Sequence, residues 1–147
     1  MDPYGAGLAV GRPASIKSPL EATVCVVLDT VREKRGLQLI PPFTRCVRAG
    51  DVLELIGTDE TDAAPRSTVD RVCGLAFAVA SESGVIMVGD VVTSDDAMTL
   101  GVVVGFDVSH EPNHFNVVLR SPERLTGKSL DLRLGARLVF GGAPDWD

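Results

Sequence analysis

The two histidines of the protein lie four residues apart in one short polar segment, Asp107–Asn116, with the sequence DVSHEPNHFN. An unperturbed imidazole changes its charge between about pH 5 and 8, so His110 and His114 can each serve as an acid, a base or a ligand. Acidic side chains stand close to both histidines, at Asp107 and Glu111. This composition predicts a catalytic site made of His114, His110, Glu111 and Asp107.

Amide and guanidinium side chains in and near this segment could hold a substrate. The stretch that follows alternates polar and apolar residues, so in a strand His114, Asn116 and Arg120 would share one face. Arg120 could grip a carboxylate, phosphate or sulfate group through two parallel hydrogen bonds. Arg71 is a charge inside an apolar run and is a further candidate. The sequence therefore predicts substrate contacts from Asn113, Asn116, Arg120 and Arg71.

The same residues also fit a structural role. Asp, Ser, Asn and Pro are turn formers, so the segment could be turn chemistry alone, and the polar strand face could simply meet solvent. A metal site is a weaker alternative, because His110 and His114 have the spacing of a helical metal site but Pro112 lies between them and the flanks resemble strands. A third ligand would be Glu111 or Asp107. We therefore expect no metal and no cofactor.

Short apolar runs separated by Gly, Pro and Asp turns make up most of the chain, and no amphipathic helical pattern exceeds one turn. Strand-like runs recur at 22–29, 44–48, 52–58, 69–80, 85–88, 91–93, 100–107, 114–120 and 135–141. Such spacing is typical of a sandwich or a barrel. Runs that are apolar on both faces near Gly101 and Gly105 favour the barrel, since glycines let a strand bend sharply.

The predicted fold is all-β: a small closed or nearly closed barrel of about eight short, mostly antiparallel strands. Residues 20–141 would form this domain, with an N-terminal arm over 1–19 and a C-terminal tail over 142–147. The three cysteines form neither a disulfide framework nor a Cys-x-x-Cys pair. Cys25 and Cys46 lie in apolar runs, so we expect them to be buried thiols.

Charge and hydropathy exclude some partners. The formal net charge of −6 argues against nucleic acid as the main partner, because phosphate binding requires a basic face. No basic N-terminal region precedes an apolar run, as a signal peptide would require. No apolar run approaches the ~20 residues that span a bilayer. We therefore expect a cytoplasmic protein without a membrane partner.

Four segments within residues 20–140 form a recognisable set: LEATVCVVLDT, GLQLIPPFTRCVRAGDVLEL, VDRV and VGDVV…LGVVVGFD…HEPNHFNVVLR. Together they resemble a family of small actinobacterial proteins of unknown function. The most specific stretch is Gly105-Phe106-Asp107 followed by His110, Pro112, Asn113 and His114. This resemblance implies no settled activity.

A second likeness, tied to no single motif, is to the small subunit of two-protein cyclases that close an aziridine ring by expelling sulfate in azinomycin-type and vazabitide-type biosynthesis. It implies a heteromeric enzyme with cationic groups for the leaving sulfate and a base for the amine. His110, His114 and Arg120 could supply those groups.

The expected function is that of an enzyme or enzyme subunit of actinobacterial specialised metabolism that acts on a small polar or anionic substrate. Aziridine formation by sulfate elimination is the reaction that the second likeness implies, together with a protein partner or a homo-oligomer. The alternative is a non-catalytic binding or scaffolding subunit that stabilises a partner enzyme. The clustered His, Asn and Arg favour the enzyme, whereas the lack of a nucleophile or cofactor motif favours the scaffold.

Overall fold

A computed structural model describes residues 16–141, and these contain strands, turns and loops but no helix. The strands are β1 (Leu20–Val27), β2 (Val31–Arg32), β3 (Leu37–Gln38), β4 (Thr44–Val47), β5 (Val52–Thr58), β6 (Thr68–Val69), β7 (Val72–Ala80), β8 (Gly84–Met87), β9 (Val91–Ser94), β10 (Thr99–Asp107), β11 (Phe115–Arg120) and β12 (Arg137–Gly141). The expected tail and all but the last four residues of the expected arm lie outside the described part of the chain.

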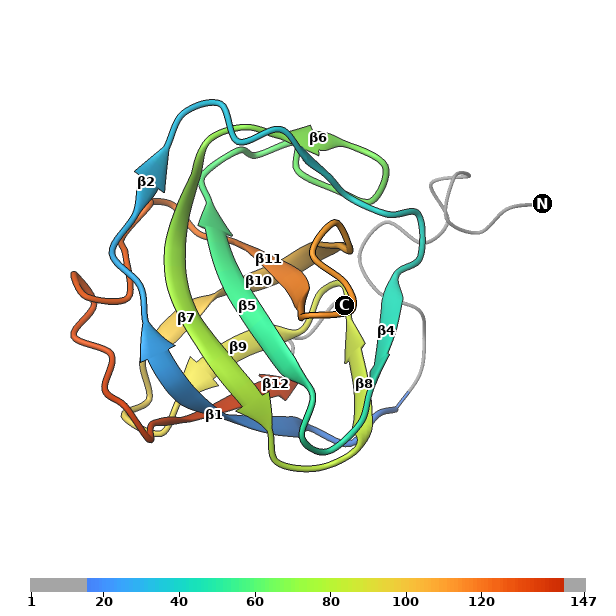
Figure 1. Cartoon of the computed structure of the whole chain (residues 1–147), viewed down its shortest axis with the longest axis vertical. Coiled ribbons are helices and arrows are strands. Elements are labelled where there is room, and N and C mark those ends of the chain that lie inside the picture. The colour runs from blue at the N-terminus through green and yellow to red at the C-terminus, as the bar shows by residue number, and fades with distance from the viewer. Residues whose placement is uncertain (1–15, 142–147) are drawn as a thin grey trace.

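Seven of these strands close into a barrel (Figure 1). They pair in the order β1-β12-β9-β10-β11-β5-β7, and β7 pairs with β1 to complete the ring. All neighbours are antiparallel except β5 and β11, which are parallel. The short β2 adds to β7, and two further pairs, β3–β6 and β4–β8, lie outside the ring. This arrangement confirms the predicted small, mostly antiparallel barrel.

The barrel interior is filled by aliphatic and aromatic side chains from all seven strands. Completely buried members include Leu53, Leu55, Phe106, Val117, Leu119, Leu138 and Phe140. In β10 the register shifts next to Gly101 and again next to Gly105, so the strand bends at both glycines as their spacing predicted. No described segment forms a helix long and apolar enough to cross a membrane.

A second, smaller apolar core lies on the outer face of β5, β11 and β10. Outward-facing Ile56, Val118 and Val104 are buried there against the β2–β4 segment and the β5–β7 loop. Leu39 packs so closely on Gly105 that an added Cβ would lie 2.7 Å from its Cδ1 atom. In Figure 1 the chain between β2 and β4 arches over one end of the barrel. The outer face of these strands is therefore covered at this end.

The expectation for two of the three cysteines was wrong. Cys25 and Cys46 are exposed, and only Cys73 is buried. Apolar neighbours in sequence do not decide which face a strand residue takes, and among the described residues Cys25 lies on the exposed side of β1. Burial raises the pKa of the Cys73 thiol, which is the property of an inert core cysteine.

Candidate functional site

Polar side chains replace apolar ones where the covered outer face of β5, β11 and β10 reaches its end. The strand register places Glu54 opposite Asn116, and Asn116 opposite Asp107. We call these three residues the polar row. Asn116 and Asp107 are 0% and 3% exposed. Of the two possibilities that the alternation left open for this face of β11, solvent or a polar cavity, solvent is therefore excluded at Asn116.

Asp107 is the acceptor that holds the polar row to its surroundings. Its Oδ1 atom accepts hydrogen bonds from the Ser109 hydroxyl, the Ser109 amide (3.0 Å) and Asn116 Nδ2 (3.0 Å). Its Oδ2 atom accepts from the backbone amide of Gln38 at 3.2 Å. Burial works to raise the pKa of Asp107, but these hydrogen bonds outweigh burial and lower it overall. The carboxylate is therefore ionised at neutral pH, and both of its oxygens accept hydrogen bonds.

A single turn between β10 and β11 brings the two histidines together. The carbonyl oxygen of His110 accepts hydrogen bonds from the amides of Asn113 (3.0 Å) and His114 (3.3 Å). The second bond closes the turn over four residues, although the segment is not a helix. The ring centroids of the two imidazoles are 5.0 Å apart with a 31° tilt. The turn therefore brings the two rings together without the helical geometry that Pro112 and the strand-like flanks argued against.

His114 is largely buried and contacts side chains of two barrel strands and of its own turn. Its side chain is 10% exposed, and its Nε2 atom lies 3.1 Å from Glu54 Oε1. Its Nδ1 atom lies 2.6 Å from Asn113 Oδ1. Phe77, which pairs with Glu54 across β5 and β7, packs its ring against the imidazole edge at a centroid distance of 5.0 Å. His110 is exposed, and its Nδ1 atom is 3.2 Å from Asn116 Nδ2.

Glu54 is one of the site residues that sequence reasoning missed. A glutamate at an alternating position of the apolar run VLELIGT is a weak signal, because it fits an ordinary solvent-facing residue. Its position beside His114 comes from the parallel pairing of β5 with β11, two strands about sixty residues apart in sequence. One nitrogen of each imidazole and an oxygen of Glu54 all lie within 4.8 Å of one another.

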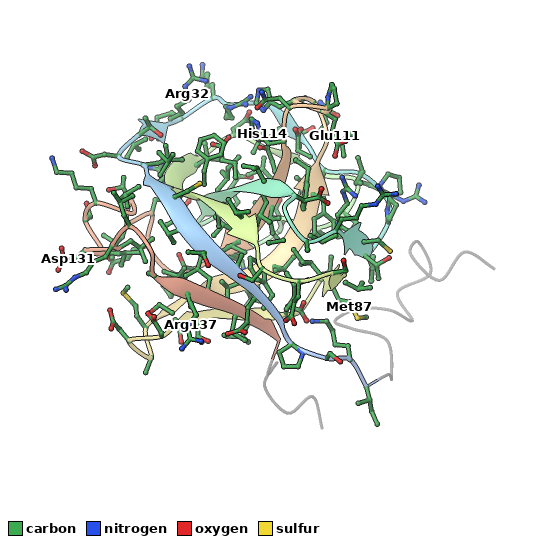
Figure 2. All side chains as sticks on the ribbon, turned by 60° about the horizontal axis from the view of Figure 1, so that its bottom comes forward. Arg32, Met87, Glu111, His114, Asp131 and Arg137 are labelled. Carbon is green, nitrogen blue, oxygen red and sulfur yellow. The ribbon has the colours of Figure 1, made fainter. Side chains whose placement is uncertain are left out.

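Two further predicted residues, Glu111 and Asn113, lie beside His114. Glu111 pairs with Arg45, which also stacks on the Phe115 ring at 4.2 Å. Glu111 and Asn113 line a small pocket of about 80 Å³ together with Arg45 and His114. In Figure 2, His114 and Glu111 appear at the same end of the barrel.

The two predicted binding arginines are not part of the cluster. Arg71 forms ion pairs with Glu33 (2.9 Å) and Asp59 (3.1 Å). Arg120 ends β11 on the exposed side, and its Nη1 atom donates to the Thr61 carbonyl at 3.3 Å. Four residues along a strand separate Arg120 from Asn116, a distance of about 13 Å.

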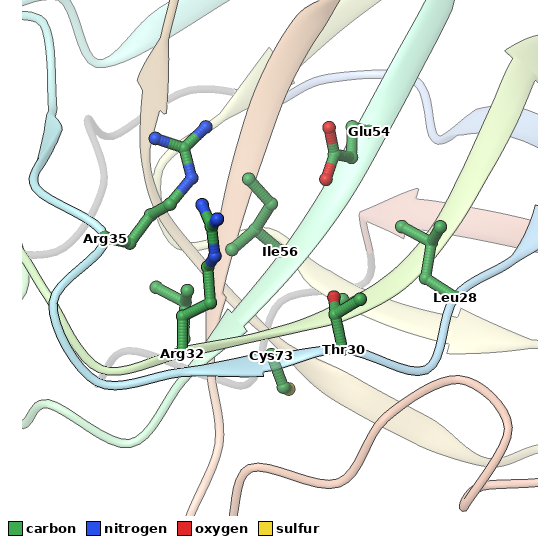
Figure 3. Close-up of a pocket in the computed structure, with 9 residues that line it drawn as sticks. Leu28, Thr30, Arg32, Arg35, Glu54, Ile56 and Cys73 are labelled. Atoms are coloured by element: carbon green, nitrogen blue, oxygen red, sulfur yellow. The ribbon is translucent and has the colours of Figure 1, made fainter.

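An open pocket of about 320 Å³ adjoins the polar row (Figure 3). It is lined by Arg32, Arg35, Glu54 and apolar side chains that include Leu28 and Ile56. Figure 3 shows both arginine side chains extending toward Ile56, with the Glu54 carboxylate farther along β5. Within residues 16–141, neither guanidinium forms a hydrogen bond or an ion pair. Neither arginine was singled out from the sequence, since both lie in the charged stretch TVREKRG.

Residues 14–141 match the model of a protein family that is described as a family of unknown function (DUF6917). No curated protein and no solved structure matches the chain.

Proposed function

Because the chain belongs to this family of unknown function, its activity has to be inferred from the site, and we propose that it binds and transforms a small anionic molecule. The main observation is that two arginines whose guanidinium groups form no ion pair among residues 16–141 share a pocket with Glu54, which contacts His114. Arg32 and Arg35 would hold the anionic end of the substrate. Glu54 and the two histidines would face its reacting end.

The local charges support an anion in this pocket. The neighbouring acid Glu33 is already paired with Arg71 and Arg124, at 2.9 and 2.7 Å, so it does not neutralise Arg32 or Arg35. A guanidinium presents two parallel donors that match carboxylate, phosphate or sulfate oxygens. The pocket volume of about 320 Å³ lies at the lower end of the range for small-molecule sites.

Aziridine formation by sulfate elimination is the specific reaction that we propose to test first. In that reaction an amine nitrogen forms a bond to carbon, the carbon–oxygen bond to sulfate breaks, and the nitrogen gives up a proton. A pair of arginines suits the departing sulfate, and a basic group beside Glu54 suits the proton. The proposal includes a partner protein that supplies the rest of the active site.

The binding step is tested by calorimetric titration with sulfate and with inorganic phosphate at low ionic strength. Removing one charge-assisted contact, as in Arg35→Gln or Arg32→Gln, should weaken binding by about tenfold or more. The matched control is Arg133→Gln, an exposed arginine elsewhere on the surface, which should bind as the unmodified chain does. Equal affinity in all four proteins would refute the assigned pocket.

The chemical step is tested by incubating small sulfated amines with the chain, with and without the product of a neighbouring biosynthetic gene, and following products by mass spectrometry. Loss of turnover in His114→Asn, with sulfate binding retained, would support a reactive role for the cluster. Full turnover by that variant, or turnover by the partner alone, would leave this chain a non-catalytic subunit.

A further inference from the structure

We propose that Glu54, His110 and His114 bind one divalent transition-metal ion. Their ligand atoms lie within 4.8 Å of one another, and Glu54 Oε1 and His114 Nε2 are 3.1 Å apart. Bonds of ~2.1 Å to a tetrahedral ion keep its ligand atoms about 3.4 Å from each other. The ligand atoms of Glu54 and His114 are therefore already about as far apart as two ligands of one ion. The ligand atom of the exposed His110 has to move toward them by no more than about 1.4 Å.

The contacts of His114 suit a metal ligand. Its Nδ1 atom faces the Asn113 amide oxygen at 2.6 Å, and its Nε2 atom faces the Glu54 carboxylate at 3.1 Å. Both partners are acceptors, but a neutral imidazole has only one N–H to donate. Donation from Nδ1 to an oxygen is the usual way in which a protein orients a ligating histidine. A cation between Nε2 and Glu54 then satisfies both remaining lone pairs.

His110 lies beside the polar row. The Asn116 amide nitrogen has two protons, and it lies 3.0 Å from Asp107 Oδ1 and 3.2 Å from His110 Nδ1. A neutral imidazole that accepts at Nδ1 carries its proton on Nε2, so Nδ1 is the nitrogen that would bind the ion once His110 turns from Asn116 toward Glu54 and His114.

Asn116 also leaves a buried acceptor beside the cluster. Its Oδ1 atom is completely buried and has no hydrogen-bond partner among residues 16–141. A buried carbonyl oxygen without a donor is costly, and such an atom signals a missing water, ion or ligand.

The ligand set points to the class of metal. Two imidazoles and one carboxylate suit zinc, iron, cobalt or nickel, whereas calcium and magnesium prefer oxygen ligands alone. Three protein ligands leave at least one coordination position open, which is the arrangement of catalytic rather than structural sites. Because Glu54 also lines the arginine pocket, the ion would stand at the reacting end of the proposed substrate. Metal binding itself does not depend on that proposal.

The test is calorimetric titration of chelator-treated full-length chain with Zn²⁺, and with Co²⁺ followed by visible absorption. Cys25→Ser and Cys46→Ser are introduced in every sample, so that exposed thiols do not bind the ions. We expect one ion per chain and a rise in melting temperature. Replacing a ligand, as in Glu54→Gln or His114→Gln, should abolish saturable binding, and Asn113→Ala should weaken it about 10- to 100-fold.

Glu111→Gln is the matched control, because this carboxylate lies next to His110 in sequence but pairs with Arg45 instead. It should bind Zn²⁺ as the parent does. Circular dichroism and melting of the metal-free variants show whether each one is folded. The proposal is overturned if the folded parent binds no ion, or if Glu54→Gln binds as tightly as Glu111→Gln. Sulfate titration of the same proteins reports on the arginine pocket separately.

Discussion

The two faces of the β5–β11 pair differ in how their side chains change along the strands. The inner face is apolar throughout and belongs to the barrel core. On the outer face, the cross-strand pairs of side chains change in character within five residues. The first pair is polar, the second is apolar, and the third contains an exposed arginine. In strand register these pairs are Glu54–Asn116, Ile56–Val118 and Thr58–Arg120.

That difference follows from what covers each face. The inner face is enclosed by seven strands, so only apolar side chains fit there. Among residues 16–141, the outer face is covered where the β2–β4 segment and the β5–β7 loop cross it, and the polar row lies at the border of this cover. A border of this kind can hold polar groups that are partly shielded from water yet reachable by a ligand, which is where binding sites form.

The largest effect is expected inside the barrel. Phe140→Ala removes a completely buried aromatic ring, and we expect a loss of about 3–5 kcal/mol in the free energy of unfolding. Urea denaturation measures this loss. Phe140 lies on β12, away from β5 and β11 in the strand order, so a folded variant should keep its affinity for Zn²⁺ and sulfate. A loss below 1 kcal/mol would mean that the barrel interior is not the main core.

Substitutions in the second apolar core should lower the free energy of unfolding by less. Leu39→Ala should cost about 2–3 kcal/mol, at the lower end for buried leucines, because a cover segment at the surface can collapse into the space. Gly105→Ala should cost about 1–3 kcal/mol by forcing its Cβ against Leu39. The double variant relieves that clash, so its loss should be smaller than the sum of the two. Strict additivity would contradict the close contact.

The next largest effect is expected for substitutions in the polar row. Asp107→Asn keeps the shape but replaces a charged acceptor of several hydrogen bonds, and we expect a loss of about 1–3 kcal/mol at pH 7. Because the pKa of Asp107 is lowered in the folded state, its stabilising effect is present above the ordinary carboxyl pKa and is lost as pH falls through the folded value.

The difference in stability between the parent and Asp107→Asn should therefore shrink as pH falls below about 4. Denaturation at a series of pH values measures it. The exposed Asp131→Asn serves as the control and should show little change at any pH. A parent–variant difference that does not depend on pH would show that the charge of Asp107 is unimportant.

The smallest effect is expected at the far end of β11. Arg120→Gln should change the free energy of unfolding by no more than about 0.5 kcal/mol, as for most exposed substitutions. It should change sulfate affinity by less than about twofold, in contrast to Arg35→Gln. Weaker sulfate binding in Arg120→Gln than in Arg35→Gln would return Arg120 to the binding site that its sequence position suggested.

Local pattern was enough to predict the fold class and part of the site. Short β-branched runs between Gly and Asp turns favour strands whatever their partners, and the glycines of β10 predicted its bends. The segment from Asp107 to Asn116 was singled out because both histidines and several polar residues are consecutive in sequence. These features depend on neighbours a few residues away, which any reader of the chain can see.

Tertiary structure alone decided which side chains meet. Glu54 reaches His114 because β5 pairs in parallel with β11, and Arg32 and Arg35 share a pocket with Glu54 because the β2–β4 segment crosses the outer face. Strand alternation divides residues between two faces but does not say which outer face will be covered. That depends on the closure of the barrel and the path of its loops, which are contacts between residues far apart in sequence.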